Sequence, residues 1–350
     1  MRKLALLFTM AAITGASHAA APDTVATPHL NYPGKVLNLT GLVYESLPGY
    51  RPLQLELYLP TAVLKPRLKP AVIWLHGGGW MVGDPRAVGI LSKAFPDWPT
   101  VLARLAARGY VVAGVSYRFS RESHFPAAIG DVKAAVRWLR MNAATYGIDP
   151  DHILVWGASA GGQLAALLGT SCNAKALEPA TDHPEISSCV QGVIDWFGPT
   201  DFSQMDAEAA LPHDASKSKA EMPAPDPGLS RPATGPQLHD AAGSAESNLL
   251  GCALRECPAG RVQSANPITY ISASTPPFLI MHGTADTAVP IEQSQILYEA
   301  LKAKGVEAQL VRVPGVNHMF NGATDAEARG IIDTVFKFID AHARPAAPAR

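Results

Sequence analysis

Residues 157–162 read GASAGG, directly after the apolar run ILVW of residues 153–156 and directly before a helix-like segment, residues 163–168. A G-x-S-x-G sequence between a strand and a helix is typical of a nucleophile elbow. The turn forces unfavourable backbone angles on the serine, and its glycine neighbours let other backbone segments approach closely. The stretch therefore predicts an α/β fold that presents Ser159 as a nucleophile.

The segments around this elbow predict a mostly parallel sheet with helices on both faces. Nearly continuous apolar runs, typical of strands covered on both faces, occupy residues 71–75, 110–115, 153–156, 190–196 and 278–281. Helical spacing of apolar residues is found at residues 100–108, 127–146, 163–168 and 292–304. A last strand and a last helix are expected at residues 309–313 and 325–343. Period-two alternation at residues 36–44 and 53–59 predicts antiparallel edge strands.

The composition favours a single catalytic domain, which we place at residues 22–343. A chain of 350 residues lies within the range of one large α/β unit. The hydrophobic fraction of 47% is enough for a large core, and the charged fraction of 17% argues against a disordered chain. With a net charge of -1 and no basic run interleaved with aromatic residues, no nucleic-acid partner is expected.

Both ends of the chain depart from the domain pattern. Residues 1–21 carry Arg2 and Lys3, then an apolar stretch and small residues, as a secretory signal peptide does. Residues 344–350 are expected to be a disordered tail. No later stretch approaches the length of a membrane helix. We therefore expect a soluble mature protein without a membrane span, either secreted or periplasmic.

Residues 203–243 interrupt the alternation of strands and helices. They are rich in Ala, Pro, Ser and Asp and show little periodicity. A long irregular stretch inside a compact domain is usually a functional lid or a disordered insertion. Because it follows the strand at residues 190–196, it should leave the sheet at the carboxyl edge, where α/β proteins bind ligands. It is therefore either a part of the substrate pocket or a mobile surface loop.

The four cysteines are expected to form two disulfides, since an exported chain with an even number of cysteines usually pairs them. We favour Cys172 with Cys189 and Cys252 with Cys257, because each pair closes a short loop beside an irregular segment. Free buried thiols are the alternative. Neither C-x-x-C spacing nor partnered histidines are present, so no metal site is expected.

A glycine-rich loop upstream of Ser159 has the character of an oxyanion hole. Residues 76–80 read HGGGW and end the strand at residues 71–75. Acyl transfer builds negative charge on a carbonyl oxygen, and the backbone N–H groups of a glycine loop can be aimed at that charge. We expect the donors to be Ala160, Gly78 and Gly79. A tight turn without a ligand is the alternative, and His76 is expected to be structural.

A serine hydroxyl needs a base to accept its proton, and His318 is the preferred candidate among eleven histidines. It lies in a loop directly after the last predicted strand, where the order of the fold requires the base. His282 is the main competitor, but it ends a strand and precedes the acid. The remaining candidates are expected at the solvated surface: His152, His183, His213, His239 and His342.

The acid that orients this imidazole is expected to be Asp286. It follows the strand at residues 278–281 in the required chain order, and Pro290 then opens the next helix. Asp195 and Asp201 accompany the preceding strand and are the alternatives.

Taken together, these motifs resemble the α/β-hydrolase esterases, in particular the bifunctional feruloyl and acetyl xylan esterase-like branch near the hormone-sensitive-lipase group. The resemblance covers residues 36–339 and rests on HGGGW, GASAGG, DWFGPTD, HGTADTAVPIEQS and VPGVNH. It implies a Ser159, Asp286 and His318 triad. The sequence departs from the family pattern at residues 203–243 and at Ala158, where many lipase-like relatives carry an acid.

The resemblance and the expected export imply hydrolysis of a carboxylic ester through an acyl-enzyme, without a cofactor. The expected substrates are acetyl or feruloyl esters of plant polysaccharide, or similar small acyl esters. Trp80 and Trp196 either stack on a sugar or aromatic acyl group or belong to the core. A prolyl-oligopeptidase-like peptidase and a non-catalytic binding protein are the competing functions.

Overall fold

A computed structural model describes residues 27–32, 34–60, 68–87, 93–95, 97–172, 174–180, 183–211 and 238–343. The expected signal peptide of residues 1–21 and the expected tail of residues 344–350 lie outside the described residues. So do His213 and most of the predicted insertion, of which only the two ends are described.

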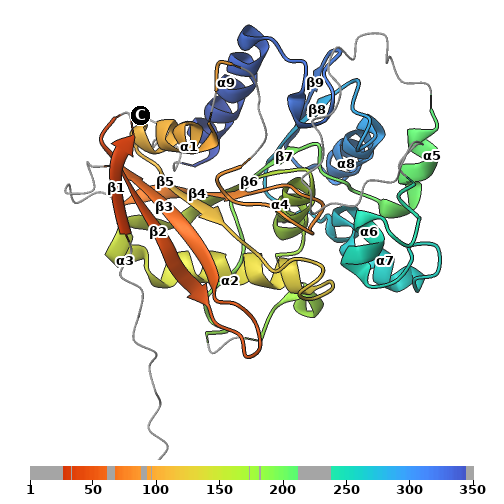
Figure 1. The fold of residues 1–350 in the computed structure, drawn as a ribbon, viewed down its shortest axis with the longest axis horizontal. Helices are drawn as coiled ribbons and strands as arrows, with labels where there is room; N and C mark the ends of the chain where they lie inside the picture. The colour runs from red at the N-terminus through yellow and green to blue at the C-terminus, as the bar shows by residue number, and fades with distance from the viewer. Residues whose placement is uncertain are drawn as a thin grey trace, which may run out of the picture.

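The described strands form one nine-stranded sheet in the order β1-β2-β3-β5-β4-β6-β7-β8-β9 (Figure 1). Their bounds are β1 Thr27–Tyr32, β2 Val36–Glu45, β3 Leu53–Pro60, β4 Lys69–Leu75, β5 Val111–Val115, β6 Ile148–Ala158, β7 Gly192–Trp196, β8 Phe278–Gly283 and β9 Ala308–Val313. The first three strands pair antiparallel, and β3 meets β5 antiparallel. All pairings from β5 to β9 are parallel. The predicted strands are confirmed, and β1 is a further edge strand that was not predicted.

The described residues contain nine α-helices. Their bounds are α1 Trp98–Ala107, α2 Ala127–Met141, α3 Ala143–Tyr146, α4 Ala160–Thr170, α5 Met205–Ala209, α6 Ala245–Leu250, α7 Ala259–Ala265, α8 Ile291–Ala303 and α9 Asp325–His342. The predicted helix at residues 127–146 is two helices, because Asn142 leaves the helical conformation and caps α2. Its side-chain amide donates to the carbonyl of Trp138.

The core has two layers, one on each face of the sheet. Side chains of α1 and α9 pack on one face, and those of α2, α4 and α8 pack on the other (Figure 1). Neighbouring residues of one strand alternate between the two layers. In β4, Ile73 packs in the layer that contains α2, α4 and α8, and Trp74 packs in the layer that contains α1 and α9. Burial on both faces explains why the central strands are continuous apolar runs.

The expected disulfides are both present, between Cys172 and Cys189 and between Cys252 and Cys257. The alternative of free thiols is therefore wrong. The first disulfide ties the end of α4 to the segment that enters β7, and the second closes the loop between α6 and α7.

The parallel strands place the residues of interest at one edge of the sheet. Ser159 directly follows β6, Asp286 follows β8, and His318 follows β9. Because parallel strands end at the same edge, three residues far apart in sequence are brought together there.

Candidate active site

Ser159 occupies a sharp turn between β6 and α4, as predicted. Its φ angle is 55°, in the left-handed region that residues other than glycine rarely adopt. Its N–H donates to the carbonyl of Trp196 at 2.8 Å, which ties the turn to β7. A Cβ added at Gly157 would clash with the carbonyl of Gly161, so the turn requires glycine. The unfavourable φ angle of Ser159 therefore follows from the tight connection, because β6 ends at Ala158 and α4 begins at Ala160.

The structure brings together the three residues expected to form a triad. His318 Nε2 lies 3.0 Å from Ser159 Oγ, and His318 Nδ1 lies 2.7 Å from Asp286 Oδ2. A carboxylate accepts hydrogen bonds, so Nδ1 carries the hydrogen of the neutral ring and Nε2 turns its lone pair toward the serine hydroxyl. This is the tautomer that a general base for serine requires.

Asp286 is fully enclosed by donors. Its Oδ1 accepts from the N–H groups of Ala288 at 2.8 Å and Val289 at 2.9 Å. Its Oδ2 accepts from His318 and also lies 3.2 Å from Nε2 of His282. Burial alone raises the pKa of Asp286, but the charges and hydrogen bonds of the two histidines outweigh it and hold the pKa well below its ordinary value. The acid is therefore ionised throughout the neutral range.

The alternative acids hold other positions. Asp195 is completely buried beneath the elbow, where it accepts from the N–H of Gly198 at 2.9 Å, and burial raises its pKa to about 6. Asp201 caps the short 3-10 helix Phe202–Gln204 and accepts from Ser203. Among the described residues, neither carboxylate hydrogen-bonds to His318. The geometry thus favours Asp286 over both alternatives.

Asn317 links the loop of the acid to the loop of the base, a role that sequence reasoning missed. Its Oδ1 accepts from Thr287 N at 2.9 Å, from Thr287 Oγ1 at 3.1 Å and from His318 N at 2.7 Å. A second link runs from the N–H of Ala285 to the carbonyl of Val316 at 3.0 Å. The only sequence signal for this role is an amide side chain directly before His318, which is too weak to be recognised alone.

The glycine-rich loop lies against the elbow. A Cβ added at Gly77 would lie 3.3 Å from the Cβ of Ser159. Gly78 and Gly79 have positive φ angles of 112° and 59°. Among the hydrogen bonds of the described residues, none uses the N–H of Gly78, Gly79 or Ala160 as donor. Ala160 is also the first residue of α4, whose N-terminal dipole favours negative charge. These three N–H groups are therefore available to an oxyanion.

His76 supports this loop from beneath and is structural, as expected. Its ring stacks on Tyr117 with a centroid distance of 4.5 Å, and Tyr117 Oη donates to the carbonyl of His76 at 2.8 Å. Burial lowers the pKa of His76 to about 4, so the ring is neutral near pH 7. Its Nδ1 lies 2.7 Å from the carbonyl of Gly77, which restrains the start of the glycine turn.

The expected stacking role of Trp80 and Trp196 is contradicted by their burial. Trp80 is 1% exposed and Trp196 is 0% exposed, so neither ring offers a face to a substrate. Trp80 Nε1 donates to Gln163 Oε1 at 3.1 Å, which anchors the glycine loop to α4. Trp196 packs edge-on against Trp156 in the core. The alternative given by the sequence, that both belong to the core, is confirmed.

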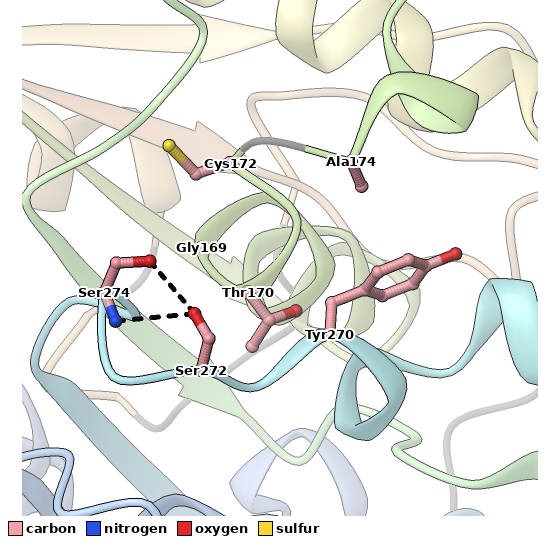
Figure 2. A pocket seen from close by; sticks show the side chains of 7 residues that line it. All are labelled: Gly169, Thr170, Cys172, Ala174, Tyr270, Ser272 and Ser274. Carbon is pink, nitrogen blue, oxygen red and sulfur yellow. Dashed lines mark hydrogen bonds between the residues drawn. The ribbon is translucent and has the colours of Figure 1, made fainter.

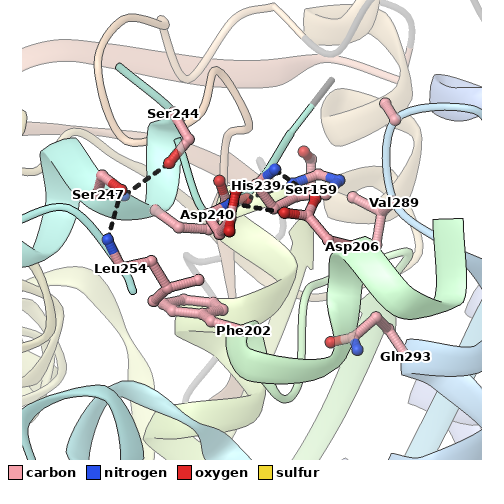
Figure 3. Close-up of polar contacts among 12 residues, drawn as sticks. Ser159, Phe202, Asp206, His239, Asp240, Ser244, Ser247, Leu254, Val289 and Gln293 are labelled. Atoms are coloured by element: carbon pink, nitrogen blue, oxygen red, sulfur yellow. Dashed lines mark hydrogen bonds and ion pairs between the residues drawn. The ribbon is translucent and has the colours of Figure 1, made fainter. Parts of the chain in front are cut away.

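The two described ends of the insertion meet each other. Asp206 accepts from the N–H of His239 at 2.6 Å and from that of Asp240 at 3.0 Å, and Figure 3 shows this pairing together with Ser159. A Cβ added at Gly79 would lie 3.2 Å from the Cβ of Ala245, so the returning segment runs into residues beside the glycine loop. The expectation that His239 is a solvated surface residue is wrong: it is 6% exposed and lies 3.1 Å from Glu246.

A small cavity of about 190 Å³ lies at the opposite end of α4 from Ser159 (Figure 2). Its lining consists of Gly169, Thr170, Cys172, Ala174, Tyr270, Ser272 and Ser274. The side chains of Ser272 and Ser274 hydrogen-bond to each other there, at 2.9 Å. Because an eleven-residue helix separates it from the nucleophile, this cavity is not part of the site.

The described part of the chain lacks both a metal-binding cluster and a membrane-spanning helix. It contains no group of three or more His, Cys, Asp or Glu residues placed to hold a metal ion. None of its helices combines the length and the apolar character needed to cross a bilayer.

Comparison with known proteins identifies the family. The BD-FAE family profile matches residues 55–301, well over half of the chain. This chain belongs to the BD-FAE family. The matched segment of the BD-FAE domain contains Ser159, Asp286 and the glycine loop, whereas His318 lies beyond it. The resemblance to α/β-hydrolase esterases found in the sequence is thereby confirmed.

Relatives of this BD-FAE protein are esterases by name. It is 28% identical to Esterase LipQ of Mycobacterium tuberculosis, over 83% of this chain and 60% of LipQ. It is 27% identical to the isoprenylcysteine alpha-carbonyl methylesterase ICME of Arabidopsis thaliana, over 79% of this chain and 55% of ICME. The chain thus spans little more than half the length of these relatives.

Solved structures of similar proteins confirm the α/β-hydrolase fold of this BD-FAE chain. A truncated form of a carbohydrate esterase from gut microbiota has a TM-score of 0.65 and 28% identity, covering 87% of this chain and 96% of that one. Esterase 2 of Thermogutta terrifontis, phosphonylated by sarin, has a TM-score of 0.64 and 27% identity, covering 88% of this chain and 96% of that one.

Proposed function

We propose that this protein is a serine carboxylesterase with Ser159 as nucleophile, His318 as general base and Asp286 as the acid that orients the base. The observation that carries the proposal is the continuous set of contacts from Asp286 Oδ2 through the His318 ring to Ser159 Oγ. The named activities of the relatives and of the similar structures support the same class of reaction.

The geometry supports a reaction in two halves. His318 Nε2 accepts the proton of Ser159 as Oγ attacks the ester carbonyl, and the oxyanion is received by the N–H groups of Gly78, Gly79 and Ala160. The tetrahedral intermediate collapses, His318 donates the proton to the leaving alcohol, and an acyl-enzyme remains. Water then repeats the cycle, with His318 as its base, and releases the carboxylic acid and free Ser159.

The proposed substrates are acetyl or feruloyl esters of plant polysaccharide, or similar small acyl esters. The similar structure of a carbohydrate esterase supports a carbohydrate alcohol. Butyrate-bound and propionate-bound structures of Thermogutta terrifontis esterase 2 support a small acyl group. The buried rings of Trp80 and Trp196 give no support for stacking on the substrate, so any such contact comes from other residues.

Two further structural features support other parts of the proposal. The paired ends of the insertion support a role of residues 203–243 at the entrance of the substrate pocket, because α6 follows directly and a Cβ added at Gly79 would lie 3.2 Å from the Cβ of Ala245. The two disulfides support export, to the periplasm or the medium.

Ester turnover by the full-length protein tests the function. We expect hydrolysis of p-nitrophenyl acetate that is lost in Ser159→Ala while the variant stays folded by circular dichroism. Acetylated xylan, methyl ferulate and p-nitrophenyl esters of rising chain length then distinguish the substrates, with acetyl release from xylan as the expected result. Equal turnover by Ser159→Ala contradicts the assignment, and activity limited to long acyl chains contradicts the substrate class.

A further inference from the structure

A second imidazole contacts the acid of the triad. His282 is fully buried near the end of β8, and its Nε2 lies 3.2 Å from Asp286 Oδ2 and 3.0 Å from the carbonyl of Val289. Its Nδ1 lies 2.7 Å from the Oγ of Ser294 on α8. His282 was considered above as a competing base, but it contacts the acid and not the nucleophile.

These contacts determine the tautomer of His282. The Val289 carbonyl and the Asp286 carboxylate are both acceptors, so the neutral ring carries its hydrogen on Nε2. The hydroxyl of Ser294 then donates to the lone pair on Nδ1. A single oxygen atom, Asp286 Oδ2, is thus contacted by two imidazoles: it accepts a hydrogen bond from His318, and it lies 3.2 Å from Nε2 of His282, whose N–H donates to the Val289 carbonyl.

Sharing this oxygen has a chemical consequence. Each N–H that donates to a carboxylate oxygen stabilises its negative charge and makes it a weaker base. The N–H edge of His282, 3.2 Å from Oδ2, therefore reduces the charge that Asp286 offers to protonated His318. It also restricts rotation of the carboxylate, since its Oδ1 is already held by the N–H groups of Ala288 and Val289.

We propose that His282 is a positioning residue that aims Asp286 Oδ2 at His318 and, by sharing that oxygen, sets the pH at which His318 becomes competent as a base. The inference rests on the proposed function, because it assigns a role relative to the triad. It predicts that loss of the contact between His282 and Asp286 strengthens the attraction between Asp286 and protonated His318.

Other charged and polar groups face His282 from the elements packed around it. From β7, the carboxylate of Asp195 interacts with the imidazole through its charge, and burial raises the pKa of Asp195 to about 6. From the loop after β7, the ring of Phe197 lies edge-on at 6.1 Å. Asp195 is therefore the group whose titration is most easily confused with that of the base, and Asp195→Asn is the matched control.

The test is the pH dependence of kcat/KM for p-nitrophenyl acetate, corrected for active sites by titration with a serine-directed organophosphate. In His282→Met, which removes both nitrogens, we expect the acid limb to move to higher pH by about half a unit or more. Ser294→Ala keeps the ring of His282 but removes the hydroxyl that fixes its tautomer. In this variant the acid limb should move in the same direction by a smaller amount. His282→Gln, which keeps a donor near Nε2, should leave the limb closer to that of the wild type.

Several outcomes decide the inference. An unmoved acid limb in both His282→Met and Ser294→Ala, with kcat reduced equally at every pH, shows a merely structural role and overturns it. The inference also fails if Asp195→Asn moves the limb and the His282 and Ser294 variants do not. If His282→Met does not fold, Ser294→Ala decides. Absence of turnover in the wild-type protein is a failure of the proposed function instead, and the titration step reveals it separately.

Discussion

The Nε2 atom of His318 lies 3.0 Å from the Oγ atom of Ser159, although 159 residues of sequence separate them. The two residues follow different strands of one parallel sheet, β9 and β6, and meet because those strands end at the same edge. In the proposed mechanism this contact supplies the base that a serine hydroxyl lacks in isolation. The first three predictions depend on it and on the residues that hold it.

Removing either partner of this contact should abolish ester turnover. Triad members act as a unit, so we expect Ser159→Ala and His318→Ala each to lower kcat/KM by about 10⁴-fold or more. The double variant should be hardly worse than either single variant. Steady-state kinetics on p-nitrophenyl acetate measure this, and additive losses in the double variant contradict a shared mechanism.

The acid can be identified by two matched variants. Asp286→Asn removes the charge and disturbs the tautomer of His318, so kcat should fall by about 10³- to 10⁴-fold. Asp201→Asn changes a cap of the short 3-10 helix Phe202–Gln204 and should lower kcat far less. If the Asp201 variant is the more damaged one, the acid has been assigned to the wrong strand.

Asn317 should matter for kcat without touching the substrate. Its Oδ1 accepts three hydrogen bonds that link the loops of Asp286 and His318. In Asn317→Ala, misplacement of the imidazole should lower kcat by about tenfold to a hundredfold with little change in KM. Thr287→Val is the control, because it removes only the hydroxyl contact and keeps the two backbone ones. A loss confined to thermal stability shows that the link is not needed for catalysis.

The two disulfides should differ in their effect on stability. The Cys172–Cys189 bridge spans 17 residues of sequence and the Cys252–Cys257 bridge spans 5. Because a longer closed loop constrains the unfolded chain more, replacing the first pair by serine should cost about 3 kcal/mol and replacing the second about 2 kcal/mol. Urea unfolding measures both costs. The reverse order indicates that native-state packing outweighs loop entropy.

The pair of His239 and Glu246 should make stability depend on pH. Burial lowers the pKa of His239, but the hydrogen bond and charge of Glu246, together with Asp206 and Asp286, raise it above the ordinary value of 6.5. A raised folded-state pKa contributes stability that is complete below the unfolded-state pKa and is lost as the pH rises through the folded-state pKa. We therefore expect Glu246→Gln to lower Tm most at acidic pH, with a difference that shrinks as the pH rises above neutrality.

The control for this pH dependence is Glu185→Gln. Glu185 forms a similar pair with His183, 3.2 Å apart, but both side chains are more than half exposed. Exposed pairs contribute little, so this variant should leave Tm unchanged across the same pH range. If the Glu246 variant behaves like the Glu185 variant, the buried pair does not stabilise the returning end of the insertion.

Several parts of the site follow from sequence because local interactions cause them. A strained turn needs glycine on both sides, so the elbow at Ser159 can be recognised in the sequence by the glycines around the serine. Central strands covered on both faces need continuous apolar residues, so β4, β6 and β8 can be recognised in the sequence as apolar runs. The chain order of nucleophile, acid and base then points to Asp286 and His318.

Other parts depend on contacts that no local pattern records. Trp80 follows the end of β4 and Trp196 is the last residue of β7, where ligand-binding residues are often found, but the packing of α4 and of the core encloses both rings. His239 lies in an irregular segment, where a surface position is the usual outcome, and Asp206 and Glu246 enclose it. The roles of Asn317 and His282 appear only when the loops after β8 and β9 are adjacent.

The elbow, the parallel sheet and the chain order of Ser159, Asp286 and His318 could be predicted from the amino-acid sequence. Each of these arises from neighbours in the chain or from a rule that holds for the whole fold. The structure was needed to choose the disulfide pairs among the possible pairings, and to show which side chains surround Asp286, which aromatic rings are buried and where the insertion returns. Those outcomes depend on the order and register of strands far apart in sequence, and hydrophobic periodicity carries no information about which distant residues will meet.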